Sequence, residues 1–118
     1  METKGLHHVN LRVDDLDVAR RFYVEVMGFE EIDRPDFGFA GAWFRMGAHQ
    51  LHLQTTDHPE TKSGDHFALH VADCAACAAE LEAKGVDVLR LDGVPGAGVQ
   101  AFLRDPSGNL IELNQPTV

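Results

Sequence analysis

Residues 6–29 read LHHVNLRVDDLDVARRFYVEVMGF, and this stretch decides the fold. Its first eight residues alternate between two faces, which predicts a β-strand over 6–13. The following residues place apolar side chains at helical spacing, so a helix is expected after the strand. Asp14 or Asp15 can cap its start, and Gly28 suits the position just beyond its end.

The second half of the chain repeats this order. A strand is expected at 65–71, then a helix capped by Asp73 and closed by Gly85. Each helix is followed by three strand-like segments: 29–35, 42–46 and 49–54 in the first half, and 86–91, 100–105 and 109–113 in the second. Two βαβββ modules are therefore predicted, about 5–56 and 64–115, within one α+β domain spanning 1–118.

Composition limits the functional classes. The chain has 118 residues, 44% of them hydrophobic, and a formal net charge of −9 without a basic cluster. That charge disfavours nucleic acid and anionic membranes as partners, since both are bound mainly through Lys and Arg. No segment resembles a signal peptide or a membrane span, so a cytoplasmic location is expected.

Strand phase brings four ligating side chains to equivalent points. In 49–54, HQLHLQ, the leucines share one face, and His52 lies on the other between two glutamines. The same phase argument applied to the other strands gives the polar-face set His8, His52, His66 and Glu112. Three imidazoles and a carboxylate suit a divalent Zn, Ni, Fe(II), Co or Mn ion. A single strand histidine is more often a surface or hydrogen-bonded residue, but four at repeated positions are harder to explain that way.

Four segments carry a resemblance to a known family: HHVNLRVDDLDVARRFYVEVMGF, LHLQ, HFALHVAD and RDPSGNLIEL. Together they make the chain similar to the vicinal oxygen chelate superfamily. That superfamily includes glyoxalase I, extradiol dioxygenases, fosfomycin-modifying enzymes and metal-free bleomycin-binding proteins. The resemblance implies curled mixed sheets that form barrel-like cavities. It also implies a homodimer in which His8 and His52 of one chain meet His66 and Glu112 of its partner.

The resemblance also implies a function and further site residues. A glyoxalase-like lyase or isomerase acting on a small molecule is expected first, with Glu112 as both ligand and base. Arg12 matches a basic residue that binds the glutathione carboxylate in glyoxalase I, whereas His52 stands where that enzyme usually has a carboxylate. An extradiol-type dioxygenase, a thiol transferase and a metal-free drug-binding protein remain alternatives. The polar faces and the aromatic stretch add Asn10, Gln54, His70 and Trp43 as substrate-binding candidates.

Two other features have competing interpretations. Phe37, Phe39, Trp43 and Phe44 cluster in one stretch, either as core or dimer contacts or as the wall of a substrate pocket. Cys74 and Cys77 form a CxxC, but they share an apolar helical stripe with Ala78 and Leu81, which favours buried core thiols over a redox motif. His70 could equally be a solvated residue rather than a proton-transfer group.

Overall fold

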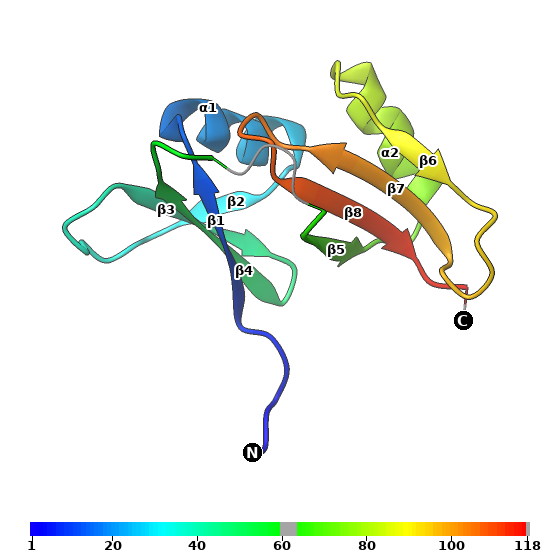
Figure 1. The fold of residues 1–118 in the computed structure, drawn as a ribbon, viewed down its shortest axis with the longest axis horizontal. Coiled ribbons are helices and arrows are strands. Elements are labelled where there is room, and N and C mark those ends of the chain that lie inside the picture. Colours follow the sequence, from blue (N-terminus) through cyan, green and yellow to red (C-terminus); the bar gives the residue numbers. More distant parts are fainter. Residues whose placement is uncertain (60–63, 118) are drawn as a thin grey trace. The chain divides into compact units, whose positions relative to one another are not determined.

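The computed structural model describes residues 1–59 and 64–117 of the chain. It divides into two compact units, residues 1–60 and 61–118, each with the element order βαβββ (Figure 1). The first unit contains β1 (His8–Val13), α1 (Leu16–Arg21), a π-helical turn η1 (Phe22–Val26), β2 (Glu30–Ile32), β3 (Gly41–Met46) and β4 (His49–Thr55). The second contains β5 (His66–His70), α2 (Cys74–Ala83), β6 (Leu89–Leu91), β7 (Val99–Arg104) and β8 (Leu110–Gln115).

Both units have the same sheet topology. The strand orders are β1-β4-β3-β2 and β5-β8-β7-β6, and in each the first strand pairs in parallel with the last. The remaining neighbours pair antiparallel, so both sheets are mixed. The predicted α+β fold with two βαβββ modules is confirmed. Each sheet is open, and neither closes into a barrel within the described residues.

The first sheet buries one face, as the alternation predicts. Leu51, Leu53 and Phe44 are at most 1% exposed, and α1 packs over β3 and β4 on this side. Strand alternation directs the intervening side chains to the opposite face. That opposite face carries the predicted site residues of this unit.

The first helical segment begins as predicted, but only its first part, α1, is α-helical. The side chain of Asp15 accepts a hydrogen bond from the Val18 N–H, so Asp15 rather than Asp14 is the N-cap. After Arg21 the helix widens into a π-turn, in which the Met27 N–H donates to the Phe22 carbonyl at 3.0 Å. Gly28 follows with φ of 77°, the left-handed conformation expected just past a helix.

The second helix covers the second sheet. Asp73 caps its start, and Cys74, Ala78 and Leu81 are buried against β7 and β8. Burial raises the thiol pKa of both Cys74 and Cys77, which disfavours the reactive thiolate. The interpretation of Cys74 as a core thiol is confirmed; Cys77 is half-buried.

A tight turn at the DPSG segment, residues 105–108, joins β7 to β8. The Gly108 N–H donates to the Asp105 carbonyl at 2.9 Å. Asp105 itself is 5% exposed, and its carboxylate accepts hydrogen bonds from the backbone N–H groups of Ser107 and Asn109 and from the Asn109 amide. This network fixes the register of β8 and thereby the position of Glu112.

Candidate metal centre

The first unit presents a stack of three rings on its polar face. The His52 ring lies between His8, with centroids 4.0 Å apart, and Trp43, at 4.1 Å and an interplanar angle of 4°. His52 is only 7% exposed as a result. The polar face of β4 is therefore not a solvated strand face at this point, because aromatic rings cover its central histidine.

This environment keeps His52 neutral. Burial lowers its pKa to about 4, and the electrostatic influence of the neighbouring His8, His7 and Arg34 acts in the same direction. A ring nitrogen of His52, Nε2, lies 2.8 Å from Gln50 Oε1. With the amide oxygen as acceptor, the proton sits on Nε2 and the lone pair on Nδ1. A neutral imidazole is the form that binds metal.

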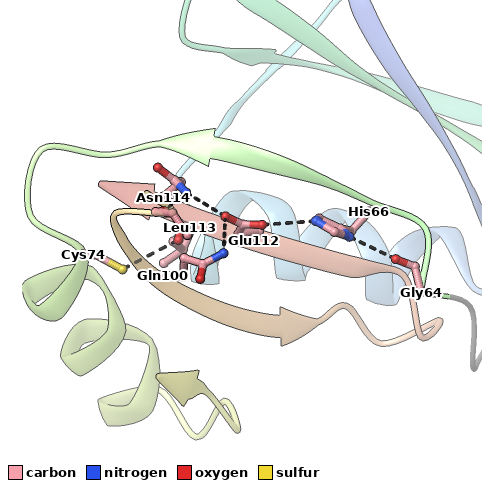
Figure 2. Close-up of polar contacts among 8 residues, drawn as sticks. Gly64, His66, Cys74, Gln100, Glu112, Leu113 and Asn114 are labelled. Atoms are coloured by element: carbon pink, nitrogen blue, oxygen red, sulfur yellow. Dashed lines mark hydrogen bonds and ion pairs between the residues drawn. The ribbon is translucent and has the colours of Figure 1, made fainter. Parts of the chain in front are cut away.

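The second unit presents a histidine and a carboxylate that face one another (Figure 2). His66 Nε2 lies 3.1 Å from Glu112 Oε1, while its other nitrogen, Nδ1, lies 3.0 Å from the Gly64 carbonyl oxygen. If the ring is neutral and Nδ1 donates to Gly64, the lone pair of Nε2 points at a carboxylate oxygen. Two electron-rich atoms in that arrangement are stabilised by a proton or a cation shared between them.

Glu112 is held in its charged form. Burial raises its pKa, but the hydrogen bonds from Asn114 and Gln100 and the interaction with His66 outweigh burial, so the pKa of Glu112 lies below its ordinary value. The Asn114 and Gln100 amides both donate to Oε2, at 2.8 and 3.2 Å. Oε1 is thus the oxygen turned toward His66 (Figure 2).

The two pairs occupy equivalent positions in their sheets. On β4 the register partner of His52 is Asn10, two residues after His8; on β8 the partner of Glu112 is Ala68, two residues after His66. The structure therefore brings the four predicted ligands into two pairs with the same placement.

The His66 and Glu112 pair has a geometry closer to that of two metal ligands than the His8 and His52 pair has. Two ligand atoms at about 2.1 Å from an ion and at roughly right angles are about 3 Å apart, which matches the His66 and Glu112 pair without rearrangement. The rings of His8 and His52 are nearly parallel, with an interplanar angle of 18°. Because a nitrogen lone pair lies in its ring plane, these two rings must tilt apart to bind one ion. Within the described ranges, no cluster of three or more metal-ligating side chains is found, and the four-ligand site stays a prediction.

The predicted substrate-binding residues fall on the same polar faces. Asn10 donates to Gln54 Oε1 at 3.1 Å, and Arg12 lies beside Gln54 in the register of β1 and β4. Trp43 stacks on His52, as described above. His70 is exposed at the end of β5, opposite Asn114. Their roles remain predictions.

The aromatic cluster divides between two environments. Phe44 is fully buried in the core, whereas Phe37 and Phe39 are 51% and 53% exposed. The core interpretation therefore holds for Phe44 alone. Trp43, on the polar face, is half-buried against His52.

Sequence reasoning missed the residues that support the ligands. Gln100 and Asn114 hold Glu112, and Gln50 contacts His52, but no site role is predicted for any of the three from the sequence. A signal was present for two of them. Asn114 and Gln50 lie two residues from a ligand on the same strand, so they share its face.

The chain belongs to the Glyoxalase/Bleomycin resistance protein/Dioxygenase superfamily, whose family model matches residues 5–113. A protein named "Probable lactoylglutathione lyase" from Synechocystis is 32% identical, over 93% of this chain and 94% of its own length. Lactoylglutathione lyase GLX1 of Arabidopsis thaliana is 34% identical over 92% of this chain, but the chain spans only 43% of that protein.

Solved structures share the fold. A glyoxalase family protein from Bacillus anthracis superimposes with a TM-score of 0.89 at 26% identity, over 99% of this chain and 98% of the other. The antibiotic binding protein TnmS3 from Streptomyces superimposes with a TM-score of 0.79 at 30% identity, over 99% of both chains. FosX of Listeria monocytogenes, a fosfomycin resistance protein crystallised with Mn(II), superimposes with a TM-score of 0.85 over 99% of this chain and 95% of its own. At 21% identity, this similarity shows a shared fold and nothing more.

Among the described residues, no helix is long and apolar enough to cross a membrane.

Proposed function

We propose that this protein is a metal-dependent enzyme of the glyoxalase type, a lyase or isomerase acting on a small carbonyl compound. The observation that carries the proposal is the equivalent placement of the His8/His52 and His66/Glu112 pairs in two modules of one fold. Relatives named as lactoylglutathione lyases at about 30% identity support this reaction class over the others.

The four side chains would bind one divalent ion, with the two pairs contributed by different chains of a homodimer. When bound, such an ion polarises a carbonyl or enolate oxygen of the substrate. Closed C2 symmetry would then give two equivalent sites per dimer.

The ligand residues would also have to be held in place, and one of them would have to accept a proton from the substrate. His66 is oriented by its Nδ1 contact to Gly64, and Glu112 by the two amides on Oε2. Glu112 would also accept the substrate proton, as the only carboxylate in the set. Its lowered pKa makes it a weaker base than a free carboxylate, so proton transfer depends on close contact with the substrate.

A metal-free small-molecule binding protein is the second candidate. It is favoured by the similarity to the antibiotic binding protein TnmS3 and by the ring stack of His8, His52 and Trp43, which offers a planar surface.

An extradiol dioxygenase is less well supported. It would need open positions on Fe(II), and His52 as a fourth ligand would occupy one of them.

Substrate assays on separately prepared Zn, Ni and Fe(II) forms distinguish these reactions. We expect turnover of the methylglyoxal–glutathione hemithioacetal or a related 2-oxoaldehyde adduct, abolished in Glu112→Gln. Oxygen uptake with catechols and no activity on any such adduct would contradict the lyase assignment. Absence of turnover together with metal-independent ligand binding would favour the binding protein.

A further inference from the structure

A cation is built into the loop that precedes β3. The guanidinium carbon of Arg34 lies 4.9 Å from the ring centroid of Phe37 and 5.1 Å from that of Phe39. A Cβ on Gly41 would be only 2.9 Å from Arg34 Nε and Cζ. The guanidinium therefore lies against the backbone at Gly41 and contacts both rings, which restricts its position.

In the part of the chain that the structure describes, the cation of Arg34 contacts two aromatic rings rather than a carboxylate. Arg20, Arg45 and Arg90 each contact a glutamate of a neighbouring element, but in residues 1–59 and 64–117 no ion pair is found for Arg34. This is notable in a chain with 19 acidic residues and only 10 lysines and arginines. A fixed cation without a carboxylate in the fold is suited to an anion from outside.

Exposed rings connect this cation to the histidines. Phe39 lies 5.9 Å from Phe37, Phe37 lies 6.0 Å from Trp43, and Trp43 stacks on His52. Phe37 and Phe39 are about half exposed, so this surface is open to a ligand in the chain as described. The contacts form a continuous aromatic surface from the loop to His52.

The pairing of β3 with β4 indicates the distance that a ligand would have to span between Arg34 and His52. Gly41, under Arg34, pairs with Gln54, which is two residues along β4 from His52. Two residues of strand correspond to about 7 Å. One small molecule is therefore long enough to place an anionic group at Arg34 and a reacting oxygen beside His52.

We propose that Arg34, Phe37 and Trp43 determine specificity by binding a small aromatic carboxylate, its ring on Phe37 and Trp43 and its carboxylate on Arg34. The placement of a reacting oxygen beside His52 rests on the proposed function; binding by the rings and Arg34 needs no metal. Arg34, rather than Arg12, is then the anion-binding residue of this site.

The test measures binding to metal-free protein with two matched probes, 3-phenylpropionate and its neutral analogue 3-phenylpropanamide. Trp43 is the only tryptophan of the chain, so its fluorescence reports binding directly. We expect the carboxylate to bind at least about 5-fold more tightly than the amide, as a charge-assisted hydrogen bond would give. Arg34→Met should reduce the ratio to about 1, Arg34→Lys should retain part of it, and the matched control Arg12→Met should leave it unchanged.

Three results would overturn the proposal: no binding of either probe, equal binding of both, or loss of the preference in Arg12→Met instead of Arg34→Met. Light scattering of Phe37→Ser provides a further check. If this variant becomes monomeric where the unmodified protein is dimeric, a second copy covers the rings and the proposal is wrong.

Metal content measured on the same variants separates this proposal from the proposed function. We expect Arg34→Met to keep its full metal content while it loses the carboxylate preference. A protein that binds no metal but keeps the preference would contradict the metal enzyme and leave the Arg34 site supported. The reverse result, full metal content without any preference, would contradict the Arg34 site alone.

Discussion

At the scale of single residues, the surroundings of His52 favour its neutral form. The residue is nearly buried between two rings, it contacts a glutamine, and it lies within the electrostatic influence of Arg34, so its neutral form is favoured. Strand phase identified the residue and its face. It could not identify the stacking, because which rings cover a side chain depends on the neighbouring strands.

The lowered pKa of His52 predicts a pH dependence of stability in the metal-free protein. An unfolded histidine takes up a proton near pH 6.5, whereas folded His52 does so only near pH 4. Between these values the unfolded state binds more protons, so stability falls as the pH is lowered. From this residue alone, we expect the free energy of unfolding to be about 2 kcal/mol lower at pH 5 than at pH 8.

Urea unfolding at the two pH values, compared between the unmodified protein and His52→Phe, measures this contribution. His52→Phe keeps an aromatic ring between His8 and Trp43 but cannot be protonated. The variant should lose about 2 kcal/mol less stability on acidification than the unmodified protein. Equal losses would show that His52 titrates normally.

At the scale of elements, the repeat and the turn residues made most of the fold predictable. Alternation located the strands, and Asp15, Asp73, Gly28 and Gly85 marked the helix ends within a residue or two. The π-turn after Arg21 was not predictable, since π- and α-helical turns place apolar residues at similar spacings. The supporting amides of Gln100 and Asn114 became visible only once β7 and β8 were paired.

Asp105 gives a prediction at this scale, because one buried carboxylate accepts three hydrogen bonds in the turn before β8. Asp105→Ala leaves those donors without this partner, so we expect a loss of about 2–3 kcal/mol in the free energy of unfolding. Chemical denaturation measures it. Asp92→Ala, which alters an exposed aspartate, serves as the control and should change stability by less than about 0.5 kcal/mol. An equally small effect of Asp105→Ala would show that the turn does not depend on this network.

At the scale of the whole molecule, the proposed site requires two chains. Heterodimers of differently tagged variants test this directly. One chain carries His8→Ala with His52→Ala, and the other carries His66→Ala with Glu112→Ala. If sites are shared between chains, one of the two sites in such a heterodimer is intact, and its metal content should be about half that of the unmodified dimer.

The two homodimers of these variants are the controls and should bind little metal. A purified heterodimer as metal-poor as its parent homodimers would contradict sharing between chains. Light scattering that shows a metal-loaded monomer at micromolar concentration would contradict it as well.

The account depends most on whether these four side chains bind a metal ion, and elemental analysis of protein purified without chelator tests this most directly. We predict close to one divalent ion per chain in the unmodified protein, and a loss of about 90% or more in His52→Ala and in Glu112→Ala at limiting metal concentration. His70→Ala, which alters a polar-face histidine outside the proposed ligand set, should keep its metal. Metal-free protein, or full metal content in both ligand variants, would contradict the account.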